Sequence, residues 1–348
     1  MDLSRCRCRP QSGQRNVLAA ARLSALLVLL TILPLPAAGQ NLGEESVRGV
    51  VQVDAIIPSD ARTAGSLGTE RVGTGVLIDD NGLVVTIGYL ILEASEVTIS
   101  GASRQPVPAT ILAYDHESGF GLIRASQPLD VAPVSLGNST ALRPMQPLLV
   151  VSHAGGLDAA GVYLVDRREF AGYWEYLLED ALFTSPPHAK FGGAALIDQA
   201  GRLVGIGSLF VNDAGRDTGP EGRTVPGNMF VPIDGLKAIM GDLLSRGRRA
   251  EPGRPWLGLT MEEHRGRVFV TRVSPDGPAE AAGIEPNDMI LGVDGVQVQG
   301  LGDLYRKLWS QGEAGVKVPL DVLRGIEVNP VTVQTTDRYR YLRLDQSF

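Results

Sequence analysis

A few side chains in this sequence could carry hydrolytic chemistry. Asp115 and His116 are neighbours, His188 follows Ser185 by three positions, and His153 begins a glycine-containing loop. A serine hydroxyl becomes a nucleophile when an imidazole removes its proton and a carboxylate orients that imidazole. Each histidine taken alone is more typical of a surface or loop position, so Ser185 and His188 are kept only as substitute catalytic candidates. No HExxH or paired-ligand spacing occurs, and the sequence predicts no metal and no cofactor.

The stretch Lys190–Ser208, KFGGAALIDQAGRLVGIGS, has the form of a catalytic loop. Two apolar runs, Ala194–Ile197 and Leu203–Ile206, flank a polar turn and predict a β-hairpin. The glycines before the hairpin predict a tight turn, which in a hydrolase would present a reactive side chain. Phe191 and Gly192 stand there instead. The stretch therefore predicts the setting of a nucleophile without the nucleophile.

The elements around this loop are predicted to be mainly β. Between about Ser46 and Phe230, short runs rich in Val, Ile and Leu alternate with Gly and Asn turns, which indicates an antiparallel sandwich or a pair of barrels. A Pro/Gly-containing linker at 248–255 separates this region from an α+β module of about 90 residues. Helical spacing first occurs at 232–247, where one face carries Leu236, Ile239, Met240, Leu243 and Leu244.

Residues 1–39 have the pattern of a secretory signal. A basic segment is followed by an apolar run, Leu23–Leu35, and then by the small residues Ala37 and Gly39. We expect cleavage before Gln40; the alternative is an uncleaved inner-membrane anchor, although the run is shorter than the ~20 residues that span a bilayer. Both cysteines, at positions 6 and 8, lie in this segment. An exported chain without disulfides favours the bacterial periplasm.

Two classes of partner are not expected. The formal net charge is −7 and no basic patch is found, which argues against nucleic acid. No apolar run after residue 39 is long enough to cross a bilayer, so we expect no membrane span once the signal is removed.

Four motifs, in the same order along the chain, resemble the HtrA/Deg family of serine proteases. GTGVLIDDNGLVVT (73–86) resembles the run before the catalytic histidine, and DHESGFGLIRA (115–125) resembles the segment of the catalytic aspartate. VSLGNSTALRPMQPLLVVSHAGG (134–156) resembles the run that enters the second barrel. GGAALIDQAGRLVGI (192–206) resembles the segment opened by the nucleophile.

The resemblance implies a fold, a domain order and an activity. The fold is a chymotrypsin/trypsin-like double β-barrel, expected over 44–232, with a helix and linker over 233–254. A small α+β PDZ domain is expected over 255–342. The activity of the family is that of a serine endopeptidase in envelope protein quality control.

The residues in the catalytic slots depart from the family pattern. The histidine slot, in a T-x-x-H pattern after the V-T run, holds Tyr89. The aspartate slot holds Gly119, and the serine slot holds Gly192, or Phe191 if the two glycine pairs are aligned. We therefore expect a proteolytically inactive homologue, a pseudoprotease. Two alternatives stay open: an endopeptidase that uses displaced residues, and a structural subunit of a mixed oligomer with an active homologue.

The PDZ-like half keeps the features of a peptide-binding domain. PDZ domains bind an extended C-terminal peptide as an added strand and hold its carboxylate in a nest of backbone amides. We expect peptide C-termini or unfolded proteins as partners, and an active HtrA homologue as a further candidate. The alternative is a docking strut that binds no peptide. By the resemblance, the peptide-binding residues are Trp256, Leu257, Gly258, Leu259, Leu304 and Leu308.

Overall fold

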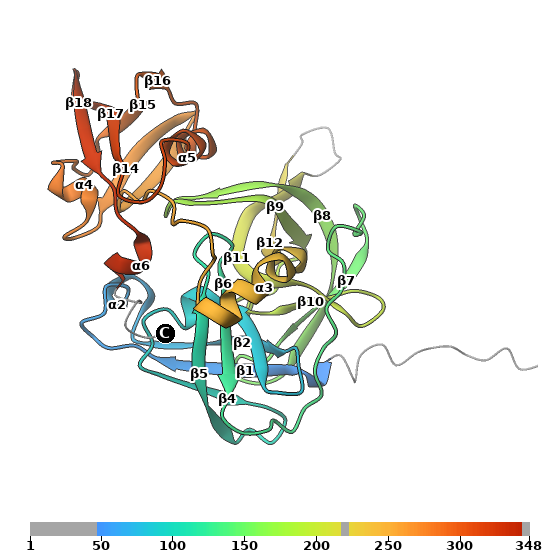
Figure 1. The fold of residues 1–348 in the computed structure, drawn as a ribbon. Helices are drawn as coiled ribbons and strands as arrows, with labels where there is room; N and C mark the ends of the chain where they lie inside the picture. The colour runs from blue at the N-terminus through green and yellow to red at the C-terminus, as the bar shows by residue number, and fades with distance from the viewer. Residues whose placement is uncertain (1–46, 217–222, 343–348) are drawn as a thin grey trace, which may run out of the picture. The chain divides into compact units, whose positions relative to one another are not determined.

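The computed structural model describes residues 47–216 and 223–342, which form two closed β-barrels and a smaller sheet (Figure 1). The prediction of a mainly β chain, with two barrels followed by a small α+β module, is confirmed. The predicted signal peptide, 1–39, lies outside the described residues. The described residues of the barrels and of the module belong to one compact unit.

Six strands form the first barrel: β1 (Val50–Ile56), β2 (Glu70–Leu77), β3 (Leu83–Ile87), β4 (Glu96–Ser100), β5 (Pro106–Tyr114) and β6 (Phe120–Ala125). They close in the order β1-β2-β3-β6-β5-β4, which leaves no strand edge open. Side chains alternate between the two faces of each strand. Val51 and Val53 of β1 are accordingly both fully buried in the barrel core. A short helix, α2 (Ala64–Leu67), follows β1, and a 3-10 turn, η1 (Gly88–Leu90), follows β3.

Six more strands form the second barrel: β7 (Pro147–Ser152), β8 (Asp158–Gly172), β9 (Tyr176–Ser185), β10 (Ala195–Ile197), β11 (Leu203–Arg216) and β12 (Thr224–Pro232). They close in the order β10-β11-β12-β9-β8-β7. The predicted hairpin of the glycine-rich loop is confirmed, because β10 pairs with β11 in antiparallel register.

The β8–β9 hairpin is longer than its barrel requires. β7 pairs with β8 only between Asp158 and Tyr163, whereas β8 and β9 pair with each other as far as Gly172 and Tyr176. Bulges interrupt this register twice and increase its twist. The outer part of the hairpin is therefore a two-stranded ribbon whose tip consists of residues 173–175.

The predicted helix is α3 (Ile233–Arg246), which packs against β5 and β11 (Figure 1). It ends at Gly247, which has a left-handed φ of +72° and donates its N–H to the carbonyl of Leu243 at 3.0 Å. Leu243 is fully buried, but the prediction that Leu244 lies on the same face is wrong, since Leu244 is 44% exposed. Successive residues are rotated by about 100° around a helix axis, which turns Leu244 away from the core.

The C-terminal module contains β13 (Leu259–His264), β14 (Arg267–Val273), α4 (Pro278–Ala281), β15 (Met289–Val293), β16 (Val296–Gln297), α5 (Leu301–Trp309), β17 (Lys317–Arg324), β18 (Glu327–Gln334) and α6 (Arg338–Tyr341). Its sheet has the order β13-β14-β15-β17-β18, with β16 paired to β15. The apolar core of the module also includes Leu177 from β9 of the second barrel. Among residues 47–216 and 223–342, every helix is too short or too polar to cross a bilayer.

Candidate functional site

The three positions predicted to replace a catalytic triad lie close together. Tyr89 stands on η1, and its hydroxyl lies 3.0 Å from the point where a Cβ on Gly192 would be. The carbonyl of Gly119 accepts a hydrogen bond of 2.7 Å from the N–H of Gly88, the residue before Tyr89. The fold therefore brings the three predicted slots together, and their residues carry no imidazole, carboxylate or serine hydroxyl. The assignment of each residue to a slot stays a prediction.

Tyr89 is held as a hydrogen-bond donor. Its hydroxyl donates to the carbonyl of Ser208 at 3.0 Å. Burial raises the pKa of Tyr89 above its ordinary value of 10.0, so the phenol stays protonated at neutral pH. A protonated phenol cannot remove a proton from a nucleophile, and this one lies against the space that a side chain on Gly192 would need.

The loop before β10 forms a tight turn. Within it, one backbone N–H that an oxyanion would need is already hydrogen-bonded to a side chain of the loop. Serine proteases bind the oxyanion through the N–H of the nucleophile and the N–H two residues earlier. The earlier position here is Lys190, whose N–H donates to Nδ1 of His188 at 3.1 Å. Phe191 is half-buried, and its carbonyl accepts a hydrogen bond of 3.0 Å from the N–H of Ala194, which closes the turn.

The substitute candidates Ser185 and His188 have different partners. The hydroxyl of Ser185 donates to the carbonyl of Pro226 at 2.9 Å. The ring of His188 accepts from Lys190, and its Nε2 lies 3.6 Å from a carboxylate oxygen of Asp158. A nucleophile needs its base within about 2.6–3.2 Å. Here the Ser185 hydroxyl binds a backbone carbonyl, and the His188 ring lies against Lys190 and Asp158, so the hydrogen bonds of the two side chains do not join them. Within the described ranges, no three His, Cys, Asp or Glu side chains are grouped as metal ligands.

Three successive backbone amides of the C-terminal module converge on one carboxylate. Gly258 has a left-handed φ of +84°, a conformation that points successive amides at one anion. The N–H groups of Leu257, Gly258 and Leu259 donate to the carboxylate of Glu175 at 2.9, 2.7 and 2.9 Å. Glu175 is at the tip of the β8–β9 hairpin and is not among the residues predicted for this site.

Backbone contacts place the rest of the hairpin tip between β13 and α5. The N–H of Met261, on β13, donates to the carbonyl of Tyr173 at 2.8 Å. The hydroxyl of Tyr305, on α5, donates to the carbonyl of Gly172 at 2.6 Å and accepts from the N–H of Glu175 at 3.2 Å. The tip thus occupies the position between a strand and a helix that an added peptide strand would take in a PDZ groove.

The other predicted peptide-binding residues are buried. Leu304 and Leu308 are fully buried in the core of the module, where Leu177 of the hairpin also packs. The ring of Trp256 lies 4.4 Å, between centroids, from the ring of Tyr341 on α6. These three residues support the groove by packing, and their direct contact with a ligand stays a prediction.

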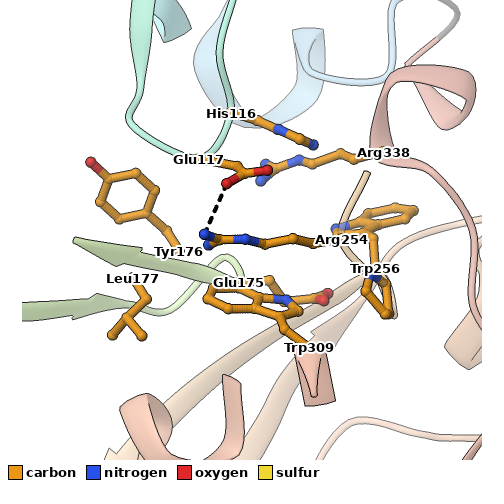
Figure 2. Close-up of a pocket in the computed structure, with 10 residues that line it drawn as sticks. His116, Glu117, Glu175, Tyr176, Leu177, Arg254, Trp256, Trp309 and Arg338 are labelled. Carbon is orange, nitrogen blue, oxygen red and sulfur yellow. Dashed lines mark ion pairs between the residues drawn. The ribbon is translucent and has the colours of Figure 1, made fainter. Parts of the chain in front are cut away.

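A small cavity of about 20 Å³ borders Glu175 (Figure 2). Arg254 lies between Glu117 and Trp309: its guanidinium is 2.8 Å from the Glu117 carboxylate and 4.3 Å from the centre of the Trp309 ring. A cavity of this volume has room for about one water molecule and none for a peptide. Burial raises the pKa of Glu175, although the three amides and the charge of Arg338 favour its ionised form.

His116 also lines this cavity, and it is held neutral. Its ring lies 4.5 Å from the ring of Tyr339, between centroids, and its Nδ1 has no hydrogen-bond partner within the described part of the chain. Burial, together with the charge of Arg338, lowers the pKa of His116 to about 3, against the opposing charge of Asp115. The imidazole is thus a buried base that resists protonation, not a catalytic base poised near neutrality.

We expect His116 to make the free energy of unfolding depend on pH between about 6.5 and about 3. In this window the unfolded chain protonates the imidazole and the folded chain does not, so the stability falls as the pH falls. The slope should approach about 1 kcal/mol per pH unit. In urea titrations from pH 7 to pH 4.5, His116→Phe should flatten the dependence. The exposed His264→Gln is the control and should keep it; equal slopes for all three proteins would contradict the prediction.

Comparisons with known proteins agree with a fold of two β-barrels followed by a PDZ domain. The sequence profile of the trypsin-like peptidase domain matches residues 73–206, and that of the PDZ domain matches residues 255–335. The HtrA-type protease AlgW, solved with a decapeptide, superposes with a TM-score of 0.51 at 18% identity, over 86% of this chain and 98% of that chain. At this identity the superposition supports the fold alone.

Curated relatives extend the match. Protease Do-like 1 of the Arabidopsis thaliana chloroplast is 26% identical over 319 residues, which cover 84% of this chain and 70% of the relative. The periplasmic serine endoprotease DegP of Escherichia coli K12 is 25% identical over 274 residues, which cover 74% of this chain and 56% of DegP. The chain thus spans little more than half the length of DegP.

The fold and these matches define the class of protein, a trypsin-like peptidase domain followed by a PDZ domain. The resemblance drawn from the four motifs is confirmed: the chain carries a trypsin-like peptidase domain and a PDZ domain, and proteases of the HtrA/Deg type are among its homologues.

Proposed function

We propose that this protein is an exported, non-hydrolytic HtrA-type homologue whose PDZ domain binds peptides or unfolded proteins that end in a free carboxylate. One observation carries the proposal. The N–H groups of Leu257, Gly258 and Leu259 converge on a carboxylate and bind it with three hydrogen bonds of 2.7–2.9 Å. The C-terminal carboxylate of a peptide presents the same pair of oxygens, and AlgW, which shares the fold, was solved with a decapeptide.

The loss of hydrolysis is supported by the barrel site. Tyr89 stands where the base is expected, Gly192 where the nucleophile is expected, and the N–H of Lys190 is engaged with His188. An enzyme without its triad retains only about 10³–10⁴ of rate over water. Export to the periplasm is supported by the pattern of residues 1–39 and by the periplasmic relatives.

We expect the purified chain to leave β-casein intact and to remain unlabelled by a fluorophosphonate probe. The physical reason is that no described imidazole lies within bonding distance of a serine in the cleft. Casein fragments would be followed on gels over a day, with an active DegP protein as the positive control. An adduct on Ser185, or cleavage that Ser185→Ala abolishes, would contradict the proposal and favour an endopeptidase with displaced residues.

Peptide recognition is tested by a single chemical change in the ligand. We expect a fluorescein-labelled peptide with a free C-terminal carboxylate to bind at least about tenfold tighter than the same peptide with a C-terminal amide, because an amide offers the nest one acceptor in place of two. Fluorescence anisotropy would measure both affinities. Equal affinities for the acid and the amide would show that the nest takes no part in binding.

A further inference from the structure

We propose that the tip of the β8–β9 hairpin is an internal ligand of the PDZ groove, in which the side chain of Glu175 takes the place of a peptide's C-terminal carboxylate. The groove is then closed by the chain's own second barrel, and an external peptide must displace the hairpin to bind. This inference rests on the proposed function, because it concerns the regulation of the same groove.

The carboxylate contacts are complete. Oε1 of Glu175 accepts from the N–H groups of Gly258 and Leu259, and Oε2 accepts from Leu257. Glu175 is 6% exposed, so these bonds are shielded from water. All three amides of the nest are therefore in use, and none is left for a second carboxylate.

One backbone bond joins the hairpin tip to the edge strand β13, as an added strand would. The N–H of Met261 donates to the carbonyl of Tyr173 at 2.8 Å, while the N–H of Leu259, two residues earlier, donates to the side-chain carboxylate of Glu175. The hydroxyl of Tyr305 closes the opposite side through its bonds to Gly172 and Glu175.

An apolar anchor accompanies these bonds. Leu177, two residues after Glu175, is 8% exposed and packs in the core of the PDZ domain. A methyl group of Leu177 lies 3.5 Å from the Cβ position of Gly302, on the helix α5 that borders the groove. The hairpin thus supplies a carboxylate, a backbone bond to β13 and an apolar side chain, the kinds of contact that a PDZ domain makes with a peptide.

The hairpin tip is held at an energetic cost. Glu175 has a left-handed φ of +57°, which is unfavourable for a residue with a side chain. Its carboxylate is also buried, and burial disfavours the charged form. The strained backbone and the buried charge both favour release of the hairpin tip from the groove. A peptide that makes the same contacts without this strain and this buried side-chain charge can therefore displace the tip.

The link from the hairpin to the barrel is short. The hydroxyl of Tyr176, next to Glu175, donates to the carbonyl of Ser118 at 2.7 Å. Ser118 precedes Gly119, the predicted slot of the lost aspartate. Displacement of the hairpin therefore moves a residue bonded to the former catalytic segment.

The test compares peptide binding by the full chain with that by three variants. Glu175→Gly removes the carboxylate and relieves the left-handed backbone, and Tyr305→Phe removes two bonds to the hairpin while it keeps the ring. Glu179→Gln changes an exposed acid on β9 and is the matched control. The probe is a fluorescein-labelled peptide that ends in Tyr-Trp-Leu with a free carboxylate, which copies Tyr173 and Trp174 and adds an apolar last residue.

We expect Glu175→Gly and Tyr305→Phe to bind the probe at least about tenfold tighter than the wild-type chain, and Glu179→Gln to match the wild type. A hairpin that fills the groove for about nine-tenths of the time lowers the apparent affinity tenfold. Hydrogen exchange measured by mass spectrometry should show faster exchange in segment 255–262 of Glu175→Gly. Circular dichroism would establish that each variant is folded. If Glu175→Gly does not fold, the comparison of Tyr305→Phe with the wild type decides the test.

The outcomes separate the two proposals. If the probe binds the wild type and the hairpin variants equally, and segment 255–262 exchanges at the same rate in all, the internal ligand is refuted and the peptide-binding function stands. If exchange accelerates in Glu175→Gly and no protein binds the probe, the hairpin does cover the amides and the peptide-binding function fails.

Discussion

Gly193→Ala should prevent the second barrel from folding, with a loss of more than about 4 kcal/mol in the free energy of unfolding. A Cβ at this position would lie 1.9 Å from the carbonyl oxygen of Thr74 and 2.8 Å from the hydroxyl of Thr86. The backbone cannot retreat, because the N–H of Gly193 donates to the carbonyl of Gly207 at 2.9 Å. Soluble yield and the thermal midpoint, followed by circular dichroism, would measure the effect.

The matched control for this change is Gly155→Ala. Gly155 has nearly the same φ, +73° against +75°, but a Cβ there meets nothing within 4 Å. This alanine should cost only the backbone penalty of about 1–2 kcal/mol. If the two alanines destabilised the chain equally, the close approach of Gly193 to the first barrel would not be the dominant cause. The close packing of Gly193 against Thr74 and Thr86 of the first barrel therefore requires a glycine at this position.

Arg249→Met should lower the free energy of unfolding by about 3–5 kcal/mol, the usual result of leaving a buried charge unpaired. Asp115 is 1% exposed, and Arg249 donates to its two oxygens at 2.9 and 2.8 Å. After the change only the N–H and hydroxyl of Ser118 would remain to bind this carboxylate. The shift in the thermal midpoint, about 2–4 °C for each kcal/mol in a domain of this size, would measure the loss.

The double variant Asp115→Asn with Arg249→Met is the control, because it removes the charge together with its partner. It should be more stable than Arg249→Met alone, and a loss below about 1 kcal/mol in the single variant would show that the pair acts as a weak surface contact. Burial would raise the pKa of Asp115, but Arg249 holds it below the ordinary value of 3.8. The contribution of this pair is therefore present above pH 3.8 and is lost as the pH falls below it.

This ion pair connects the segment 115–125 to the linker that leads into the PDZ domain. Residues 115–125 resemble the segment of the catalytic aspartate, yet here Asp115 binds Arg249 and Glu117 binds Arg254. Both arginines belong to the linker between α3 and β13. The segment thus braces the first barrel against the start of the PDZ domain. A buried ion pair and an ion pair stacked on Trp309 account for the charges of Asp115 and Glu117 in this segment.

The repeating patterns of the sequence were sufficient for most of the fold. Short runs rich in Val, Ile and Leu, separated by Gly and Asn turns, predicted the barrel strands, because these residue types favour extended backbone. The helix α3 was predicted with one wrong core residue, Leu244, because a rough stripe of apolar residues does not fix the rotation of a helix to within one position. The convergence of Tyr89, Gly119 and Gly192 follows from the barrel topology once the resemblance is accepted.

The sequence by itself determined the two barrels, the PDZ domain and the absence of a serine, an imidazole and a carboxylate from the predicted triad slots, because these depend on local spacing and residue type. Only the tertiary structure decided what fills the PDZ groove. Glu175 lies 82 residues before Leu257 and has no motif around it; a lone acid in a hairpin turn is usually a solvated residue. Its function depends on the length and twist of β8 and β9, which carry the carboxylate to the nest. Such a long-range contact is fixed by packing, not by any local pattern in the chain.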